Sequence, residues 1–316
     1  MKVQTEVELG GGSLALGDLA GNKKRHRRES VVRNLFRAAA MASIVISLAI
    51  VGSLSEKALT FIASVDLGSL WSNGWFPRRG LFDLKTIVVG TLIVSGIAMV
   101  VAAPLGLGAA LYLSEYAKPR VRRVLKPVLE ILASIPSVVL GVFALTFISP
   151  DLVQPVFEGA GIFNLLAAGI AVGVLVTPLV ASVSEDAMRA VPSALREASY
   201  GLGARKRTTV TKVIFPAAIS GIVASLILGV SRAIGETMVV AMVAGGTGGS
   251  SLTLDPTQPG QTMTGAMTSL AIGSDQVRGA DNAFPSLFFV GLLLFVMTLG
   301  LNVLSDRFVR RVREKY

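Results

Sequence analysis

Residues 197–216 read EASYGLGARKRTTVTKVIFP, a polar and basic segment that separates two long apolar stretches. The segment opens on Glu197-Ala198-Ser199, carries four basic side chains between positions 205 and 212, and closes on Pro216. Gly203 suits a left-handed turn at which the chain reverses direction. The pattern therefore predicts a helix, a tight turn and a second helix, held as a hydrophilic hairpin between two apolar helices.

Uncharged stretches flank this hairpin and recur along the chain. Each is 18 residues or longer, which is the length that an α-helix needs to cross about 30 Å of hydrocarbon. Runs this long are not barrel strands, so we expect an all-α membrane protein with about six transmembrane helices. The predicted spans, within a transmembrane domain of residues 36–306, are residues 36–56, 86–114, 130–150, 160–184, 214–244 and 283–305.

The net charge of +10 could suggest a nucleic-acid partner, but the positions of the basic residues indicate membrane topology instead. Basic residues crowd into segments 23–37, 118–126, 189–212 and 307–315. Cytoplasmic loops carry an excess of Lys and Arg, so we expect both termini and the 197–216 hairpin to be cytoplasmic. The other three loops share only Lys57, Arg78, Arg79, Lys85 and Arg278.

The two ends of the chain are predicted to be basic cytoplasmic tails, a disordered one over residues 1–35 beside anionic lipid and a shorter one over 307–316.

The chain has no cysteine, and its one histidine, His26, lies in the first tail. We therefore expect no metal site and no catalytic residue. The glycine-rich residues 245–251 lack the Lys and the helix of a P-loop and are interpreted as a flexible connector.

Helix breaks and close helix packing are also visible in the apolar stretches. Pro104, Pro136 and Pro178 each fall inside a predicted span, where the missing N–H favours a kink. Gly169 and Gly173 are four residues apart and would let another helix approach closely.

Two ionisable residues, Arg232 and Glu236, lie inside the fifth predicted span. A charge near the bilayer centre costs about 2.5–3.5 kcal/mol on insertion scales, so neither side chain should face lipid. At positions i and i+4 of one helix the two side chains can pair. One interpretation is a structural ion pair. The other is a substrate pathway in which Arg232 binds an oxyanion and Glu236 neutralises Arg232 when the path is empty.

The 197–216 hairpin resembles the EAA loop of ATP-binding-cassette importer permeases, which docks on an ATPase. The positions that match this pattern in spacing are Glu197, Ala198, Ser199, Gly203, Val213, Phe215 and Pro216. Ser199, Val213 and Phe215 replace the Ala, Ile and Leu of the family pattern with residues of similar size or hydrophobicity. The resemblance implies a type I importer permease fold with a cytoplasmic coupling loop.

The fifth span also resembles the phosphate importer permeases of the PstC type, whose matching helix carries an Arg-Ala-x-Gly-Glu-Thr-Met segment. Here residues 231–246 read SRAIGETMVVAMVAGG, and the likeness continues in YLSEYA (112–117), IPSVVLG (135–141) and RAVPSALREAS (189–199). It implies that Arg232 and Glu236 are the charged pair of a phosphate path.

The resemblance further implies partners and a cellular place. A second permease of the PstA type, an ATPase dimer carrying ATP and magnesium, and an external phosphate-binding protein would complete an importer in the prokaryotic plasma membrane. This chain would be its non-catalytic subunit, without a cofactor of its own.

Another oxyanion such as sulfate or molybdate is the alternative substrate, and a proton-coupled secondary anion transporter is the alternative class. Because the fifth span is expected to run unbroken from Pro216 to Arg232, docking surface and anion site would share one helix.

Overall fold

The computed structural model describes residues 23–71, 74–246, 248–272 and 282–312, and most of them are helical. The prediction of an all-α protein is thereby confirmed. The chain divides into two compact units, residues 1–53 and 54–316. The helices are α2 (Lys23–Ser64), α3 (Leu84–Leu111), α4 (Pro119–Ala133), α5 (Ser137–Phe143), α6 (Leu165–Arg189), α7 (Ser193–Gly201), α8 (Lys206–Thr209), α9 (Phe215–Ala217), α10 (Ile219–Ile234), α11 (Met238–Val243), α12 (Met263–Ile272) and α13 (Ala283–Val312).

Short segments of other geometry connect these helices. Three of them are π-helical, a form that often marks functional sites. The short elements are the 3-10 helices η1 (Leu67–Trp71) and η2 (Pro77–Arg79), the strands β1 (Trp75–Phe76) and β2 (Leu81–Phe82), and the π-helices η3 (Tyr112–Tyr116), η4 (Ala144–Val153) and η5 (Val210–Ile214).

Within the described residues, four helices are each long and apolar enough to cross a bilayer: Arg27–Ser64, Leu84–Tyr116, Leu165–Arg189 and Ala283–Arg307. Two helix pairs raise the number to six if each bent pair is one span. Pro119–Ala133 and Ser137–Val153 meet at 87°, and Lys206–Ala217 and Ile219–Ile234 meet at 68°. The third stretch, in which Pro136 was expected to favour a kink, and the fifth stretch, which was expected to be continuous, are therefore both broken helices.

Proline and glycine explain where the breaks fall. Pro136 stands at the N-terminal cap of α5, where its missing N–H cannot continue the α4 ladder. Pro216 lies in α9, directly before the second bend. Gly235 ends α10. Pro104 and Pro178, by contrast, lie inside α3 and α6, each of which remains one helix.

The predicted N-terminal tail differs from expectation where the structure describes it. Residues 23–35 belong to helix α2 and are not disordered, and α13 continues through the basic residues up to Val312. An uninterrupted run of good helix formers, without Gly or Pro from Lys23 to Val51, explains the early start of α2. Residues 1–22 and 313–316 lie outside the described residues.

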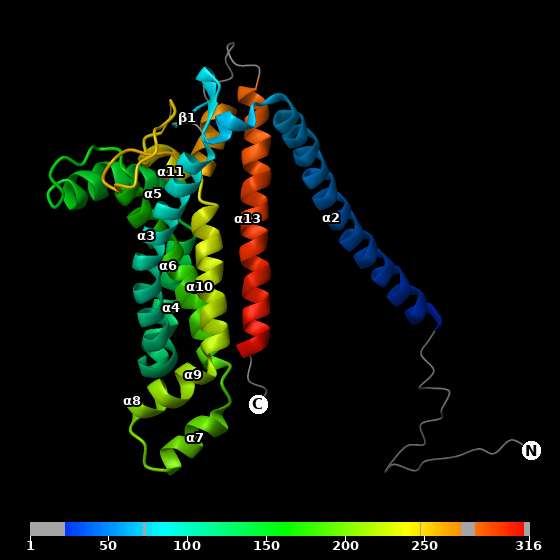
Figure 1. Ribbon diagram of the computed structural model, residues 1–316. Helices are drawn as coiled ribbons and strands as arrows, with labels where there is room; N and C mark the ends of the chain where they lie inside the picture. Colours follow the sequence, from blue (N-terminus) through cyan, green and yellow to red (C-terminus); the bar gives the residue numbers. More distant parts are fainter. Residues whose placement is uncertain (1–22, 72–73, 247, 273–281, 313–316) are drawn as a thin grey trace, which may run out of the picture. The chain divides into compact units, whose positions relative to one another are not determined.

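Helices α3 and α6 form the centre of the second unit and run side by side (Figure 1). Glycines on α6 allow the contact. A Cβ added at Gly169 would lie 2.6 Å from Cβ of Ile97, and one at Gly173 would lie 2.7 Å from Cβ of Val101 and 2.9 Å from the backbone oxygen of Ala98. The predicted close approach at these two glycines is thus confirmed.

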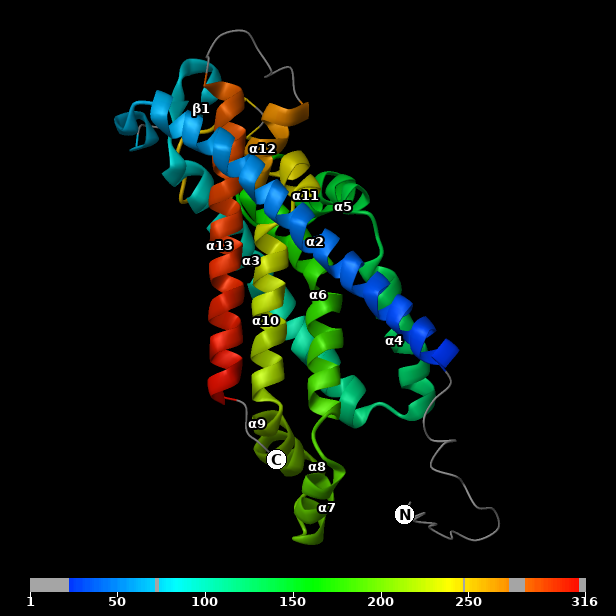
Figure 2. The same cartoon turned by 90° about the vertical axis from the view of Figure 1, so that its right-hand side faces the viewer.

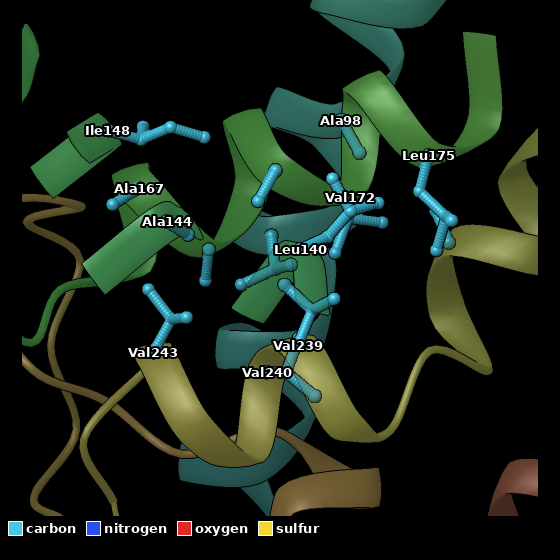
Figure 3. Packing of buried hydrophobic residues seen from close by; sticks show 14 of the residues in the cluster. Ala98, Leu140, Ala144, Ile148, Ala167, Val172, Leu175, Val239, Val240 and Val243 are labelled. Carbon is cyan, nitrogen blue, oxygen red and sulfur yellow. The ribbon is translucent and has the colours of Figure 1, made fainter. Parts of the chain in front are cut away.

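Apolar side chains from four parts of the chain fill the space beside this helix pair. Figure 3 shows Ala98 of α3, Leu140 of α5, Val172 of α6 and Val239 of α11 pointing toward one another, all of them buried. The cluster holds the short helices α5 and α11 against α6. Helix α10 packs on α6 as well, where the hydroxyl oxygens of Ser184 and Ser225 lie 2.6 Å apart.

A small hairpin with buried aromatic side chains, Trp75 and Phe82, lies at the end of the unit that carries β1 and α11. Strands β1 and β2 pair in antiparallel fashion, with Trp75 opposite Phe82. The glycine-rich segment is packed here and is not a free connector, because Ser250 exchanges two backbone hydrogen bonds with Trp75, and Gly260 donates to the carbonyl of Ala244. Position 247 lies outside the described residues.

Candidate coupling loop and anion site

The predicted hairpin is built from α7, α8, η5 and α9, and it lies at the end of the second unit opposite to α11 and β1 (Figures 1 and 2). Every residue of α7 is exposed or half-buried. Glu197 and Ala198 are exposed, and Leu202 just beyond the helix is 90% exposed. A small apolar helix face that protrudes in this way is suited to a groove on a partner protein.

The turn of the hairpin has the predicted conformation at Gly203, whose φ is +77°. The backbone N–H of Gly203 donates to Tyr200, and that of Ala204 donates to Ser199, which closes the C-terminus of α7. The hydroxyl oxygens of Ser199 and Thr209 lie 2.8 Å apart. The side chain of Ser199 therefore links the two arms of the hairpin, a role that the family alanine could not fill.

Arg196 fixes α7 to the transmembrane helices, and the sequence did not reveal it beyond its charge. Its guanidinium donates to the backbone oxygens of Val191 (2.5 Å) and Met188 (2.8 Å), and to Oε1 of Glu115 in η3 (3.1 Å). The first two oxygens lie at the C-terminal end of α6, where carbonyls lack helical partners. The feature of the sequence that could have indicated this contact is Glu115, an isolated carboxylate directly after a long uncharged stretch.

A buried apolar cluster supports the return of the chain to the membrane. It joins the ends of α3 and α6 to η5 and the start of α10. We call it the apolar seat, and it consists of Ala110, Met188, Val191, Val210, Ile214, Ala218 and Ile222. Leu195 of α7 and Phe215 of α9 pack against it. A displacement of α7 would therefore disturb the packing of three transmembrane helices, α3, α6 and α10.

Arg232 and Glu236 lie close together but not on one continuous helix. Helix α10 ends at Ile234, and Glu236 occupies the break before α11 begins at Met238. Nη2 of Arg232 is 3.8 Å from Oε2 of Glu236. The exposed fraction of the Arg232 side chain is 53%, whereas that of Glu236 is 4%. The pair thus combines a fixed, buried carboxylate with a guanidinium that remains open on one side.

Glu236 is held on several sides. Its Oε1 accepts a hydrogen bond of 3.4 Å from the backbone N–H of Val239, in the first turn of α11. Its backbone oxygen accepts one of 2.7 Å from the hydroxyl of Thr264 in α12. Contacts with α11 and α12 thereby set the position of Glu236, and Arg232 reaches its carboxylate from α10.

The bend near Ala218 corrects a second expectation. Pro216 and Arg232 do not share one unbroken helix, because α9 and α10 meet at 68°. A mechanical path from the hairpin to Arg232 must pass through the packing of the apolar seat and of α6 on α10, and cannot be a rigid rod.

A cavity of about 410 Å³ opens beside α11, at the end away from the hairpin. Its lining includes Arg78, the backbone of Gly246, and the polar side chains of Gln261, Thr268 and Ser269. Nε2 of Gln261 donates to the hydroxyl oxygen of Ser269, whose proton goes to Ala266. Oε1 of Gln261 has no partner in the described part of the chain. The remaining lining includes the apolar side chains of Val240, Ala241, Ala244 and Ile272, so the cavity is mainly apolar with a few groups that can bind a polar solute.

A second charged cluster, not anticipated from the sequence, ties α4 to α6. Glu185 of α6 is 1% exposed, and its Oε1 is 2.6 Å from both Nε and Nη2 of Arg122. Nζ of Lys126 is 3.6 Å from Oε2 of Glu185 and 3.2 Å from Oδ1 of Asp186. From the sequence, Arg122 and Lys126 indicated only the membrane topology. The adjacent acidic residues Glu185 and Asp186, at the end of a long apolar stretch, were the feature of the sequence that could have indicated this cluster.

These features describe a helical protein with a protruding hairpin at one end and an Arg232–Glu236 ion pair at the break between α10 and α11. Residues 102–314 match the family described as binding-protein-dependent transport system inner membrane components. The chain belongs to this family, and the resemblance to importer permeases is confirmed. It is therefore a membrane-embedded permease subunit of that transporter class.

Individual relatives agree with this assignment. The chain is 33% identical over 301 residues to a probable ABC transporter permease, YqgH, of Bacillus subtilis, covering 94% of this chain and 95% of the relative. It is 36% identical over 257 residues to the phosphate transport system permease protein PstC 1 of Mycobacterium tuberculosis, covering 75% of each. Among solved structures, a bacterial ABC transporter of the polysaccharide alginate shares the fold, with a TM-score of 0.62 at 14% identity over 92% of this chain and all of the other.

Proposed function

We propose that this chain is the permease subunit of an ATP-driven importer that moves inorganic phosphate across the prokaryotic inner membrane, with both termini in the cytoplasm. The observation that carries the proposal is the half-exposed guanidinium of Arg232 beside the buried carboxylate of Glu236, within an importer permease. Intramembrane charges of this kind mark substrate paths. The name of the Mycobacterium tuberculosis relative supports phosphate as the anion.

Arg232 would bind phosphate by its planar donor fork, which suits an oxyanion. Glu236 would compensate the charge of Arg232 while the path is empty. When phosphate arrives, the nearby carboxylate repels it, so that the anion binds weakly enough to leave again. The buried position of Glu236 supports this division, because only Arg232 is open to a solute.

The energy would come from other chains. An ATPase dimer that holds ATP and magnesium would receive Glu197, Ala198 and Ser199 of α7, with the turn at Gly203 and the arm up to Pro216 completing the docking surface. ATP-driven closure of that dimer would move α7, and Arg196 and the apolar seat would pass the motion to α3 and α6. The chain itself would need no cofactor and no nucleic-acid partner.

Two further proteins complete the proposed importer. A homologous permease of the PstA type would supply the other wall of the channel, which would shield Arg232 from lipid. An external phosphate-binding protein would deliver the anion near the cavity beside α11. Family membership favours this arrangement over a proton-coupled secondary transporter, which would need neither a binding protein nor a docking hairpin.

The test of this function is the ATPase activity of the complex that co-purifies with this chain from its native membrane. We expect the complex to contain an ATPase and a second permease, and a phosphate-loaded binding protein to stimulate ATP hydrolysis. Stimulation by sulfate- or molybdate-loaded binding protein alone would assign a different oxyanion. Absence of any ATPase from the complex would contradict the proposal.

A further inference from the structure

A second concave site lies at the hairpin end of the molecule, between α4 and the ends of α3 and α6. It has a volume of about 600 Å³. Four of its lining side chains are cationic and one is a carboxylate. We call it the basic cleft, and its polar lining consists of Ser114, Arg122, Arg123, Lys126, Glu130 and Arg189.

Half of these cations are already compensated by the protein. Arg122 and Lys126 form the ion pairs with Glu185 and Asp186 described above. Arg123 and Arg189, in contrast, have no carboxylate within 4.0 Å in the part of the chain that the structure describes, and both are exposed. Arg123 comes from α4 and Arg189 is the last residue of α6, so two elements bring their uncompensated charge to one cleft.

Helix α4 also carries an exposed apolar surface. All of its residues are exposed or half-buried. Val121, Val124, Val128 and Ile131 are spaced as one helical face and have exposed fractions of 37%, 63%, 44% and 65%. At 100° per residue this stripe lies on the face of α4 opposite Arg122, Arg123 and Lys126. An apolar face opposite a basic face is the pattern of a helix at the boundary between hydrocarbon and headgroups.

We propose that the basic cleft binds the headgroup of an anionic phospholipid. A phosphodiester would accept hydrogen bonds from Arg123 and Arg189, which lack an acidic partner of their own. Basic pockets between transmembrane helices on the cytoplasmic side are suited to such headgroups. The proposal depends on neither the transported substrate nor the ATPase, because the cleft is separate from Arg232.

Native mass spectrometry of the full-length chain in detergent tests the proposal. The probes are phosphatidylglycerol and phosphatidylcholine of equal chain length at equal concentration. We expect wild-type protein to retain phosphatidylglycerol preferentially. Each basic residue near an anionic lipid contributes about a fivefold preference, so Arg123→Gln with Arg189→Gln should weaken the preference for phosphatidylglycerol about 25-fold.

The matched control is Arg205→Gln with Arg207→Gln, which removes the same charge from the exposed hairpin at the same end. This variant should keep the wild-type preference. Equal loss in both double variants, or unchanged retention in the cleft variant, would overturn the site. Displacement of the lipid by inorganic phosphate at millimolar concentration would overturn the lipid assignment and make free phosphate the ligand. The melting temperature of each variant in detergent without lipid separates misfolding from lost binding.

Discussion

Arg232 carries a charge in an apolar stretch, where burial of a charged side chain costs free energy, and its surroundings reduce that cost. The buried carboxylate of Glu236 compensates the guanidinium without covering it, since more than half of the arginine side chain stays open. Lysine would keep the charge at this position, but it would lose the planar fork that binds two oxygens at once. Arg232 is therefore the residue at which the proposed transport can be tested most specifically.

We expect Arg232→Ala to lower phosphate uptake by about 10- to 100-fold, the effect of losing charged hydrogen bonds of about 1.5–3 kcal/mol. Arg232→Lys should fall between alanine and wild type. The measurement is the initial rate of radiolabelled phosphate uptake into proteoliposomes. Ser231→Ala is the control, because Ser231 precedes Arg232 on α10 and instead contacts Asn302 of α13. Wild-type uptake by Arg232→Ala would contradict the assignment.

Glu236 should act in the opposite sense. In Glu236→Gln the amide oxygen can still accept the hydrogen bond from Val239, so the break between α10 and α11 is kept. Arg232 loses its opposing charge, however, and should hold phosphate more tightly. We expect a lower apparent KM together with a lower maximal uptake rate. A lower rate with an unchanged or higher KM would show that Glu236 only supports the fold.

Arg196 is expected to connect ATP hydrolysis to transport. Arg196→Gln removes the bonds that hold α7 to the end of α6 and to Glu115. The complex should still hydrolyse ATP but import less phosphate per ATP. Lys212→Gln, which removes one exposed charge from η5, serves as the control. Parallel loss of ATPase activity and uptake would instead indicate a defect of docking.

At the scale of elements, α3 and α6 form the most extensive helix–helix contact of the second unit. Gly173→Ala would place a Cβ 2.7 Å from Val101 and 2.9 Å from a backbone oxygen, so the helices must separate. Such overpacking costs about 1–3 kcal/mol. We expect a lower melting temperature in detergent. Gly108→Ala, the same change at a position with nothing within 4 Å, should leave it unchanged or raise it. Equal melting temperatures for the two variants would contradict this packing.

The helical elements were largely predictable, because their signal is the length of uncharged sequence. The long helices α3, α6 and α13 coincide with uncharged stretches, and the close approach at Gly169 and Gly173 followed from residue size. The breaks were less accessible. Apolar composition does not change at Pro136 or Ala218, so hydropathy runs through both bends, and only the packed neighbours determine whether a proline interrupts a helix.

The candidate site was predictable only where single residues stand out. Arg232 and Glu236 are conspicuous because they are charged residues in an apolar stretch. The hairpin is conspicuous because it is a polar segment between two apolar stretches. The contacts of Arg196 with Glu115 and of Arg122 with Glu185 depend on which helices become neighbours, because these partners lie 81 and 63 positions apart in the sequence. Residues near the ends of spans carry charge for topology as well as for contacts, and their sequence does not separate the two roles.

At the scale of the whole molecule, packed helices join the two ends of the second unit. The hairpin lies at one end, the cavity beside α11 lies at the other, and Arg232 and Glu236 lie at the junction of α10 and α11 (Figure 1). The bend between α9 and α10 means that motion must pass through the apolar seat and through α6. This arrangement suits alternating access, in which helices rock around a fixed site.

The most direct measurement of the central claim is phosphate uptake by proteoliposomes that contain the purified complex, with binding protein supplied outside and ATP enclosed or omitted. We predict accumulation of phosphate that requires enclosed ATP, exceeds that of sulfate, and is lost in Arg232→Ala while ATP hydrolysis continues. Uptake without ATP that follows an imposed pH gradient would contradict the account and would identify a proton-coupled transporter instead.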